Sequence, residues 1–281
     1  MTPDRAGGPT AEWVLAGCLA ALLVVSAAAV PTLTAARPAH EIPVYGASAA
    51  DGESLQRADG DAWADAPATT VPMSSAGAAV PNADDTTVER VRVEVARTDA
   101  RLYMRLSWAD GSRDTSADEI HAFADGVAVQ LPRNETSRPP IAMGSTDNLV
   151  NVWYWSGATG NEELLAGGPG TTTAFAESTL QTNASYEDGR WNVVFSRSIG
   201  SRSENRTAIP QDRDMDVAFA AWNGSNMERS GQKTASEWYY LALGPGPQGP
   251  PYETILWVVA GIAIVATTLV TLEGVRRTRG D

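Results

Sequence analysis

The stretch VRVEVARTDARLYMRLSW, residues 91–108, predicts the fold class of this chain. In Val91–Val95 apolar and charged residues alternate with a period of two, and apolar and polar residues alternate again in Leu102–Trp108. The intervening Thr98-Asp99-Ala100 is typical of a turn. Two alternating runs joined by a short turn indicate an antiparallel β-hairpin.

Similar short runs continue along the chain and are separated by turn dipeptides, as at Asp110-Gly111 and Asn223-Gly224. The runs are residues 127–131, 149–155, 191–195, 217–222 and 238–243. We find no long helical period between them and no internal repeat. Many short strands without β-α-β alternation favour an all-β fold, an antiparallel β-sandwich, which we assign to residues 37–243.

Both ends of the chain carry an apolar run that can cross a membrane. Residues 13–30 and 255–272 each contain 18 uncharged residues, close to the ~20 that span a bilayer. We therefore expect one or two flanking transmembrane helices. The first, within residues 1–36, is either a retained helix or a cleaved signal peptide. The second covers residues 253–273, after a Gly/Pro-rich linker at 244–252.

The charges beside these runs predict which side the sandwich occupies. Arg5 precedes the first run, and Arg276, Arg277 and Arg279 lie in the tail 274–281 that follows the second. Because positive flanks stay on the cytoplasmic side, the sequence predicts a cell-membrane protein with an extracytoplasmic main domain.

Composition excludes several classes of function. With 34 acidic and 21 basic residues the net charge is −13, which argues against nucleic-acid binding. One Cys and two His leave no set of thiolates for an iron–sulfur cluster and no multi-His metal centre. Twenty of the basic residues are Arg and only Lys233 is Lys, which together with the many acids is typical of a salt-adapted, halophilic protein.

Three groups of residues follow one another in an order that resembles a known family. They are Trp108-Ala109-Asp110 followed by Asp125-Gly126-Val127-Ala128-Val129-Gln130, Met143-Gly144 followed by Trp153-Tyr154-Trp155, and Trp222-Asn223-Gly224 followed by Lys233 and Trp238. From about Trp63 to Leu243 the chain resembles the haem-binding γ-subunits of ethylbenzene dehydrogenase and the related type II dimethyl-sulfoxide-reductase-like molybdoenzymes. No single motif is specific; their order and spacing together carry the resemblance.

The resemblance implies a β-sandwich that holds one non-covalent haem b with a Met and a Lys as axial ligands. The matching positions are Met143 and Lys233. It also implies a cytochrome b-type electron-transfer subunit with no turnover of its own. Its partners would be a molybdopterin catalytic subunit and an iron–sulfur subunit. The chain departs from soluble members of the family in its C-terminal apolar run.

Elementary chemistry agrees with this ligand pair. A thioether is a soft ligand that raises the potential of haem iron. A Lys amine ligates only when it is neutral, and burial favours that state. Arg cannot replace it, because a guanidinium has no free donor pair. We expect Trp153, Trp155, Trp222 and Trp238 to wall the haem slot.

Other readings of the same residues remain open. Met143 and the tryptophans are also typical of an apolar core. His121 is a rival haem ligand, and Met73 and Met227 are rival thioethers. Acidic pairs such as Asp84-Asp85 are typical of a solvated surface. The main alternative function is a non-haem sandwich that binds carbohydrate or another ligand at the cell surface, and a purely structural surface protein is a third possibility.

Overall fold

The structure is a computed structural model that describes residues 40–134, 137–200 and 205–244, together with scattered helical residues between 259 and 277. The chain divides into two units after Glu41, and only His40 and Glu41 of the first unit are described. The predicted segments 1–36, 244–252 and 253–281 lie wholly or largely outside the described residues. Within the part that is described, no helix combines the length and apolarity needed to cross a bilayer.

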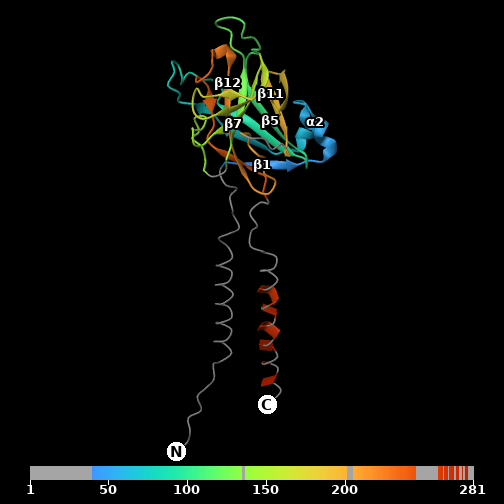
Figure 1. Cartoon of the computed structure of the whole chain (residues 1–281). Helices are drawn as coiled ribbons and strands as arrows, with labels where there is room; N and C mark the ends of the chain where they lie inside the picture. The colour runs from blue at the N-terminus through green and yellow to red at the C-terminus, as the bar shows by residue number, and fades with distance from the viewer. Residues whose placement is uncertain are drawn as a thin grey trace, which may run out of the picture. The chain divides into compact units, whose positions relative to one another are not determined.

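The second unit is built almost entirely from strands (Figure 1). The strands are β1 (Glu41–Gly46), β2 (Ala68–Pro72), β3 (Ser74–Ser75), β4 (Arg90–Arg97), β5 (Arg101–Ala109), β6 (Gly126–Pro132), β7 (Val150–Ser156), β8 (Gly160–Ala166), β9 (Thr173–Ala174), β10 (Gln181–Glu187), β11 (Arg190–Ser198), β12 (Met215–Trp222), β13 (Thr234–Ala235) and β14 (Tyr239–Ala242). The short helical turns are η2 (Ala49–Asp51), α2 (Gly52–Gln56), η3 (Asp61–Asp65) and η4 (Gly224–Asn226).

These strands form one continuous 14-stranded sheet whose main order is β10-β11-β5-β4-β1-β14-β12-β6-β7-β8-β9. The predicted hairpin is the antiparallel pair β4 and β5, in which Val93 pairs with Leu106. We call β10 to β1 in this order the first half, and β14 to β9 the second half. The halves are joined where β1, which runs parallel to β4, lies beside β14.

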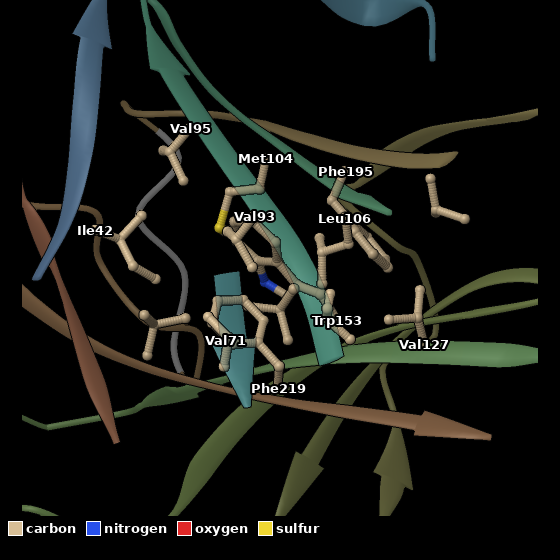
Figure 2. Close-up of a cluster of buried hydrophobic side chains, with 14 of the residues drawn as sticks. Ile42, Val71, Val93, Val95, Met104, Leu106, Val127, Trp153, Phe195 and Phe219 are labelled. Carbon is tan, nitrogen blue, oxygen red and sulfur yellow. The ribbon is translucent and has the colours of Figure 1, made fainter. Parts of the chain in front are cut away.

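The main core lies between the two halves. Val93, Leu106 and Phe195 from the first half share one buried cluster with Trp153 and Phe219 from the second half. Figure 2 shows these side chains pointing toward one another from strands of both halves. Burial of this interior is the main driving force for the fold, since each large apolar side chain contributes roughly 1.5–3 kcal/mol.

The all-β prediction is confirmed, with one difference in architecture. A sandwich consists of two separate sheets, whereas here β1 and β14 continue the hydrogen-bonded ladder from one half into the other. The result is a half-barrel in which one sheet folds over a single core. The short strand β1 escaped prediction because Glu41–Gly46 contains only a weak alternation of apolar residues.

The outer face of the first half is covered by the short helical turns between β1 and β2. Leu55 and Trp63 from these turns pack against Tyr103 of β5 and Val194 of β11. The guanidinium of Arg105 lies 5.0 Å from the centre of the Trp63 ring. The same arrangement, a sheet with apolar residues on both faces, recurs in the second half and positions the candidate site there.

Candidate functional site

The candidate site lies on the outer face of the second half, opposite the main core. Strand side chains alternate between two faces. In β7, Trp153 belongs to the main core, whereas Val150 and Val152 belong to a separate apolar cluster. In β6 and β12, Ala128 and Ala220 contribute to that same second cluster. We call this cluster the outer apolar face.

Small residues make the centre of this face shallow, and aromatic residues stand at its edge. Ala128, which is 3% exposed, pairs directly with Ala220 across β6 and β12. Tyr154 and Trp222 meet edge to face with their ring centres 5.4 Å apart. Trp238 packs on the same cluster. A flat apolar floor with aromatic walls suits a planar apolar group.

Two loop segments cover the outer apolar face. The first cover segment, residues 137–149, connects β6 to β7, and the second, residues 229–238, leads from η4 through β13. The indole N–H of Trp238 donates to the carbonyl oxygen of Pro139 at 3.1 Å and thereby ties the two segments together. The indole N–H of Trp222 donates to the carbonyl oxygen of Ser230 at 3.3 Å.

The cover segments bring Met143 and Lys233 into contact. The amine nitrogen Nζ of Lys233 lies 3.6 Å from the thioether sulfur Sδ of Met143, although 90 positions separate them in sequence. Both side chains are half-buried. In zinc sites, metal–sulfur and metal–nitrogen bonds are about 2.3 and 2.0 Å long. The two donor atoms are therefore close enough to bind one metal ion of similar size after a small increase in the distance between them.

Lys233 is positioned by strand pairing on both sides. In β13, Ala235 pairs with Ala220 of β12 on the outer apolar face, and Lys233 precedes Ala235 by two residues, so both point to that face. On the other side, the N–H of Ala76 donates to the carbonyl oxygen of Lys233 at 3.0 Å. The direction of the amine is thus set by the sheet.

Burial makes the amine of Lys233 easier to deprotonate. Its pKa is lowered below the usual 10.5 because the side chain is removed from water. Among the described residues, no carboxylate lies within 4.0 Å to hold it as a cation. Its amine instead lies 5.0 Å from the centre of the Trp222 ring. A neutral amine of this kind is a possible metal ligand, which an ion-paired surface Lys is not.

Met143 is held in a backbone conformation that few residues adopt. Its φ is +63°, in the left-handed region, and the following Gly144 has φ +76°. The carbonyl oxygen of Met143 accepts from the N–H of Gly168 at 2.9 Å. A Cβ on Gly144 would lie 2.5 Å from the carbonyl oxygen of Asn148, so only Gly fits there. Strain of this kind is typical of functional positions.

A protein-family model described as ethylbenzene dehydrogenase matches residues 60–179 and 174–234, which include strands β2 to β12, Met143 and Lys233. The chain belongs to the ethylbenzene dehydrogenase family. This confirms the resemblance that the motifs indicated.

Three relatives are similar over most of their length. A protein of Haloferax mediterranei described as a respiratory nitrate reductase haem subunit is 54% identical over 95% of this chain and 96% of its own. The chlorate reductase subunit gamma of Ideonella dechloratans is 32% identical over 71% of this chain and 83% of its own. The dimethylsulfide dehydrogenase subunit gamma of Rhodovulum sulfidophilum is 30% identical over 67% and 76%.

A solved structure also resembles the fold at a distance. A family 9 carbohydrate-binding module from Caldicellulosiruptor kristjanssonii, in complex with glucose, covers 75% of this chain and 100% of its own length at 12% identity, with a TM-score of 0.43. A likeness this remote says nothing about the ligand of a member of the ethylbenzene dehydrogenase family.

The structure brings together four of the six residues predicted for the haem site. Met143, Lys233, Trp222 and Trp238 meet at the outer apolar face. It does not bring Trp153 and Trp155 there, because both belong to the main core. Residues two apart in a strand point to the same face, so Trp153 and Trp155 point together, and the face that they share is the one that packs on the main core.

The rival ligands lie elsewhere in the fold. His121 is exposed in the β5–β6 loop, and Met73 is buried in the main core. Met227 is 41% exposed and follows η4. Sequence reasoning missed Tyr154, which stands between the two core tryptophans of β7 and therefore faces the site. The alternation of the strand was the signal that could have found it.

Proposed function

We propose that this chain is a haem b–binding electron-transfer subunit of a molybdoenzyme complex, with Met143 and Lys233 as the axial ligands of one haem. The carrying observation is the 3.6 Å approach of a thioether and a half-buried amine, which has no ion-pair partner among the described residues, over the outer apolar face. The names of the relatives, a haem subunit and two gamma subunits of oxidoreductases, support the same function.

The residues present fit the cofactor. The donor set of one thioether and one amine suits the two axial positions of haem iron. The outer apolar face, with the small side chains of Ala128 and Ala220, would provide apolar surroundings for the macrocycle. When bound, the haem supplies a one-electron redox couple, and the chain itself needs no catalytic residue.

Each protein group has a separate task in this proposal. Burial lowers the pKa of Lys233 and so favours the neutral amine that could ligate iron, and the Trp222 ring lies beside that amine. The Trp238–Pro139 hydrogen bond holds the cover segments at the right separation. The sulfur of Met143 raises the potential of the iron. The half-exposed position of the pair leaves a short path for electrons to a docked partner.

We further propose that the subunit is anchored to the cell membrane with its sheet on the extracytoplasmic side. The support is in the sequence, in the two charge-free runs and the Arg-rich C-terminal flank. In that location it would exchange electrons with a molybdopterin subunit through an iron–sulfur subunit. Protease added to wall-stripped cells should degrade residues 40–250 while a tag after Asp281 stays intact. If only the tag were digested, the orientation would be the opposite of the proposed one, with the sheet on the cytoplasmic side.

The ligand assignment is tested by the spectrum of the assembled protein. Wild-type protein should give reduced-minus-oxidised bands typical of a b-type cytochrome, and Lys233→Arg should lose them while its far-ultraviolet circular dichroism is unchanged. Arg keeps the positive charge but offers no free donor pair. Normal haem content in folded Lys233→Arg protein would exclude Lys233 as a ligand. Complete absence of b-type bands in the wild type would favour the ligand-binding alternative.

A further inference from the structure

A second cluster of polar side chains lies away from the candidate haem site, at the β5–β6 connection. Asp110 follows the end of β5, Asp125 precedes β6, and Asp114 lies in the loop between them. One carboxylate oxygen of each lies within 4.8 Å of the other two. Asp110 and Asp125 are 4% and 0% exposed, so this is no ordinary acidic surface.

Asp125 is held in a fixed orientation by three N–H donors. Its Oδ1 accepts from the backbone N–H of Gly224 at 2.8 Å. Its Oδ2 accepts from the backbone N–H of Asp114 and the indole N–H of Trp191, both at 2.8 Å. Hydrogen bonds of this kind favour the charged form of a carboxylate.

Asp110 presents a buried oxygen that has no partner. Its Oδ1 accepts from the backbone N–H of Ser112 at 3.2 Å, but its Oδ2 is buried without a hydrogen bond. The indole N–H of Trp108 favours the charged form of Asp110 without reaching hydrogen-bond geometry. A buried oxygen without a hydrogen bond is unfavourable and therefore calls for an explanation, of which a bound ion is one.

No basic group neutralises the three carboxylates. Within the described parts of the chain, none of them forms an ion pair with Arg, Lys or His within 4.0 Å. Burial, with further repulsion from Asp125, raises the pKa of Asp110 to about 6, and burial also raises the pKa of Asp125. The fold therefore places three carboxylates close together, two of them buried, and their combined negative charge is unfavourable unless a cation or a proton binds to them.

We propose that Asp110, Asp114 and Asp125 form a binding site for one Ca²⁺ ion. All the converging donors are oxygens, which Ca²⁺ prefers and which zinc or copper sites rarely use alone. Ca²⁺–oxygen distances are about 2.3–2.6 Å, so oxygens bound to one ion lie at most roughly 5 Å apart. The 4.8 Å limit between these carboxylates agrees with that span.

The surroundings supply space for the remaining ligands of the ion. A cavity of about 300 Å³ opens beside the cluster and is lined by Asp114, Phe123 and Gly224 among others. It gives water access to the half-exposed Asp114. Because Ca²⁺ takes six to eight oxygen ligands in flexible geometry, waters from this cavity can complete an irregular loop site, which Mg²⁺ tolerates less well.

The site would tie the two halves of the sheet together. Asp110 directly follows β5 of the first half, and Asp125 directly precedes β6 of the second. Through Oδ1 of Asp125 the cluster also holds Gly224, from which the chain continues to Lys233. The bound ion therefore stabilises the turn that precedes the second cover segment.

The test measures thermal unfolding of the full-length protein after treatment with EDTA, at high NaCl so that surface charge is screened. Ca²⁺ at 100 times its dissociation constant should raise Tm by roughly 5–10 °C. Asp114→Asn should lose this shift, because it removes one of the three carboxylate ligands. Its fold should be preserved, because Asp114 is half-exposed. Asp118→Asn, an exposed acid in the same loop, is the matched control and should keep the shift.

Terbium luminescence gives a second readout that does not depend on unfolding. Tb³⁺ bound at the carboxylates should be sensitised by excitation of Trp191 and Trp108, and added Ca²⁺ should quench the signal by displacing it. The proposal is wrong if EDTA-treated wild-type protein shows neither effect, if Mg²⁺ gives the same shift as Ca²⁺, or if Asp114→Asn responds like wild type. In that case a proton shared with Asp110 accounts for the cluster, and Asp110→Asn should stabilise the protein irrespective of Ca²⁺.

Discussion

Replacing Asp125 by Asn should destabilise the fold by about 3 kcal/mol. Asp125 accepts three N–H donors, from Gly224, Asp114 and Trp191. Asn has one acceptor oxygen, so at least one buried N–H loses its partner, which costs about 1–3 kcal/mol. The bonds that remain become neutral, which loses about 1 kcal/mol each. Removal of the repulsion with Asp110 recovers about 1 kcal/mol.

Asp110→Asn is the matched comparison, because Asp110 accepts only one hydrogen bond from a donor of normal geometry. We expect it to cost less than about 1 kcal/mol. Both variants should be compared with wild type in EDTA by urea unfolding, followed by tryptophan fluorescence. Asp125→Asn should lower the free energy of unfolding by about 3 kcal/mol at an unchanged m-value. A loss below about 0.5 kcal/mol, or a larger loss in Asp110→Asn, would refute the reasoning.

Four further predictions concern the residues of the candidate haem site. Met143→Leu should lower the haem potential and alter the spectrum, while the free energy of unfolding changes by less than about 1.5 kcal/mol. The control is Met227→Leu, at an exposed position with a similar left-handed backbone, which should leave the potential and the spectrum unchanged. Gly144→Ala should lower Tm and haem retention together, because its Cβ would clash with Asn148; a wild-type Tm would contradict this. In a spectroscopic pH titration, the six-coordinate haem should persist at neutral pH and be lost in acid, because only neutral Lys233 ligates and burial lowers its pKa. The free energy of unfolding of the haem-free protein should increase as pH rises toward 10.5, because in that range Lys233 is protonated in the unfolded chain and less so in the folded one. A free energy of unfolding that does not change with pH in this range would contradict the prediction.

Periodicity predicted the strands in which apolar side chains alternate clearly and missed those in which the alternation is weak or absent. The alternation in residues 91–108 corresponds to β4 and β5 almost residue for residue. In contrast, β10 (Gln181–Glu187) is a polar strand with no buried residue, so it leaves no hydrophobic pattern to detect. A strand of that kind is formed by pairing with its neighbour β11 and not by its own burial.

The site was predicted in part, for reasons that lie in the same periodicity. The family resemblance pointed to Lys233, and its being the single Lys in an Arg-rich chain agreed with a need for an amine at that position. No sequence pattern says which face of a two-sided strand turns to the core, so Trp153, which belongs to the main core, was expected to line the haem slot. The buried carboxylates Asp110 and Asp125 were hidden among 34 acidic residues, because only the fold distinguishes a buried acid from a solvated one.

The alternation along β7 and β12 has a consequence for how this subunit can evolve. In each strand every second side chain stabilises the interior, and the residues between them build the outer apolar face. Selection can therefore act on the two sets separately. Under the proposed function, substitutions at positions such as Ala220 or Tyr154 would adjust the redox potential or the fit to a new partner complex, while Phe219 and Trp153 preserve the fold. A lineage can in this way adapt one scaffold to different terminal reactions without passing through unstable intermediates.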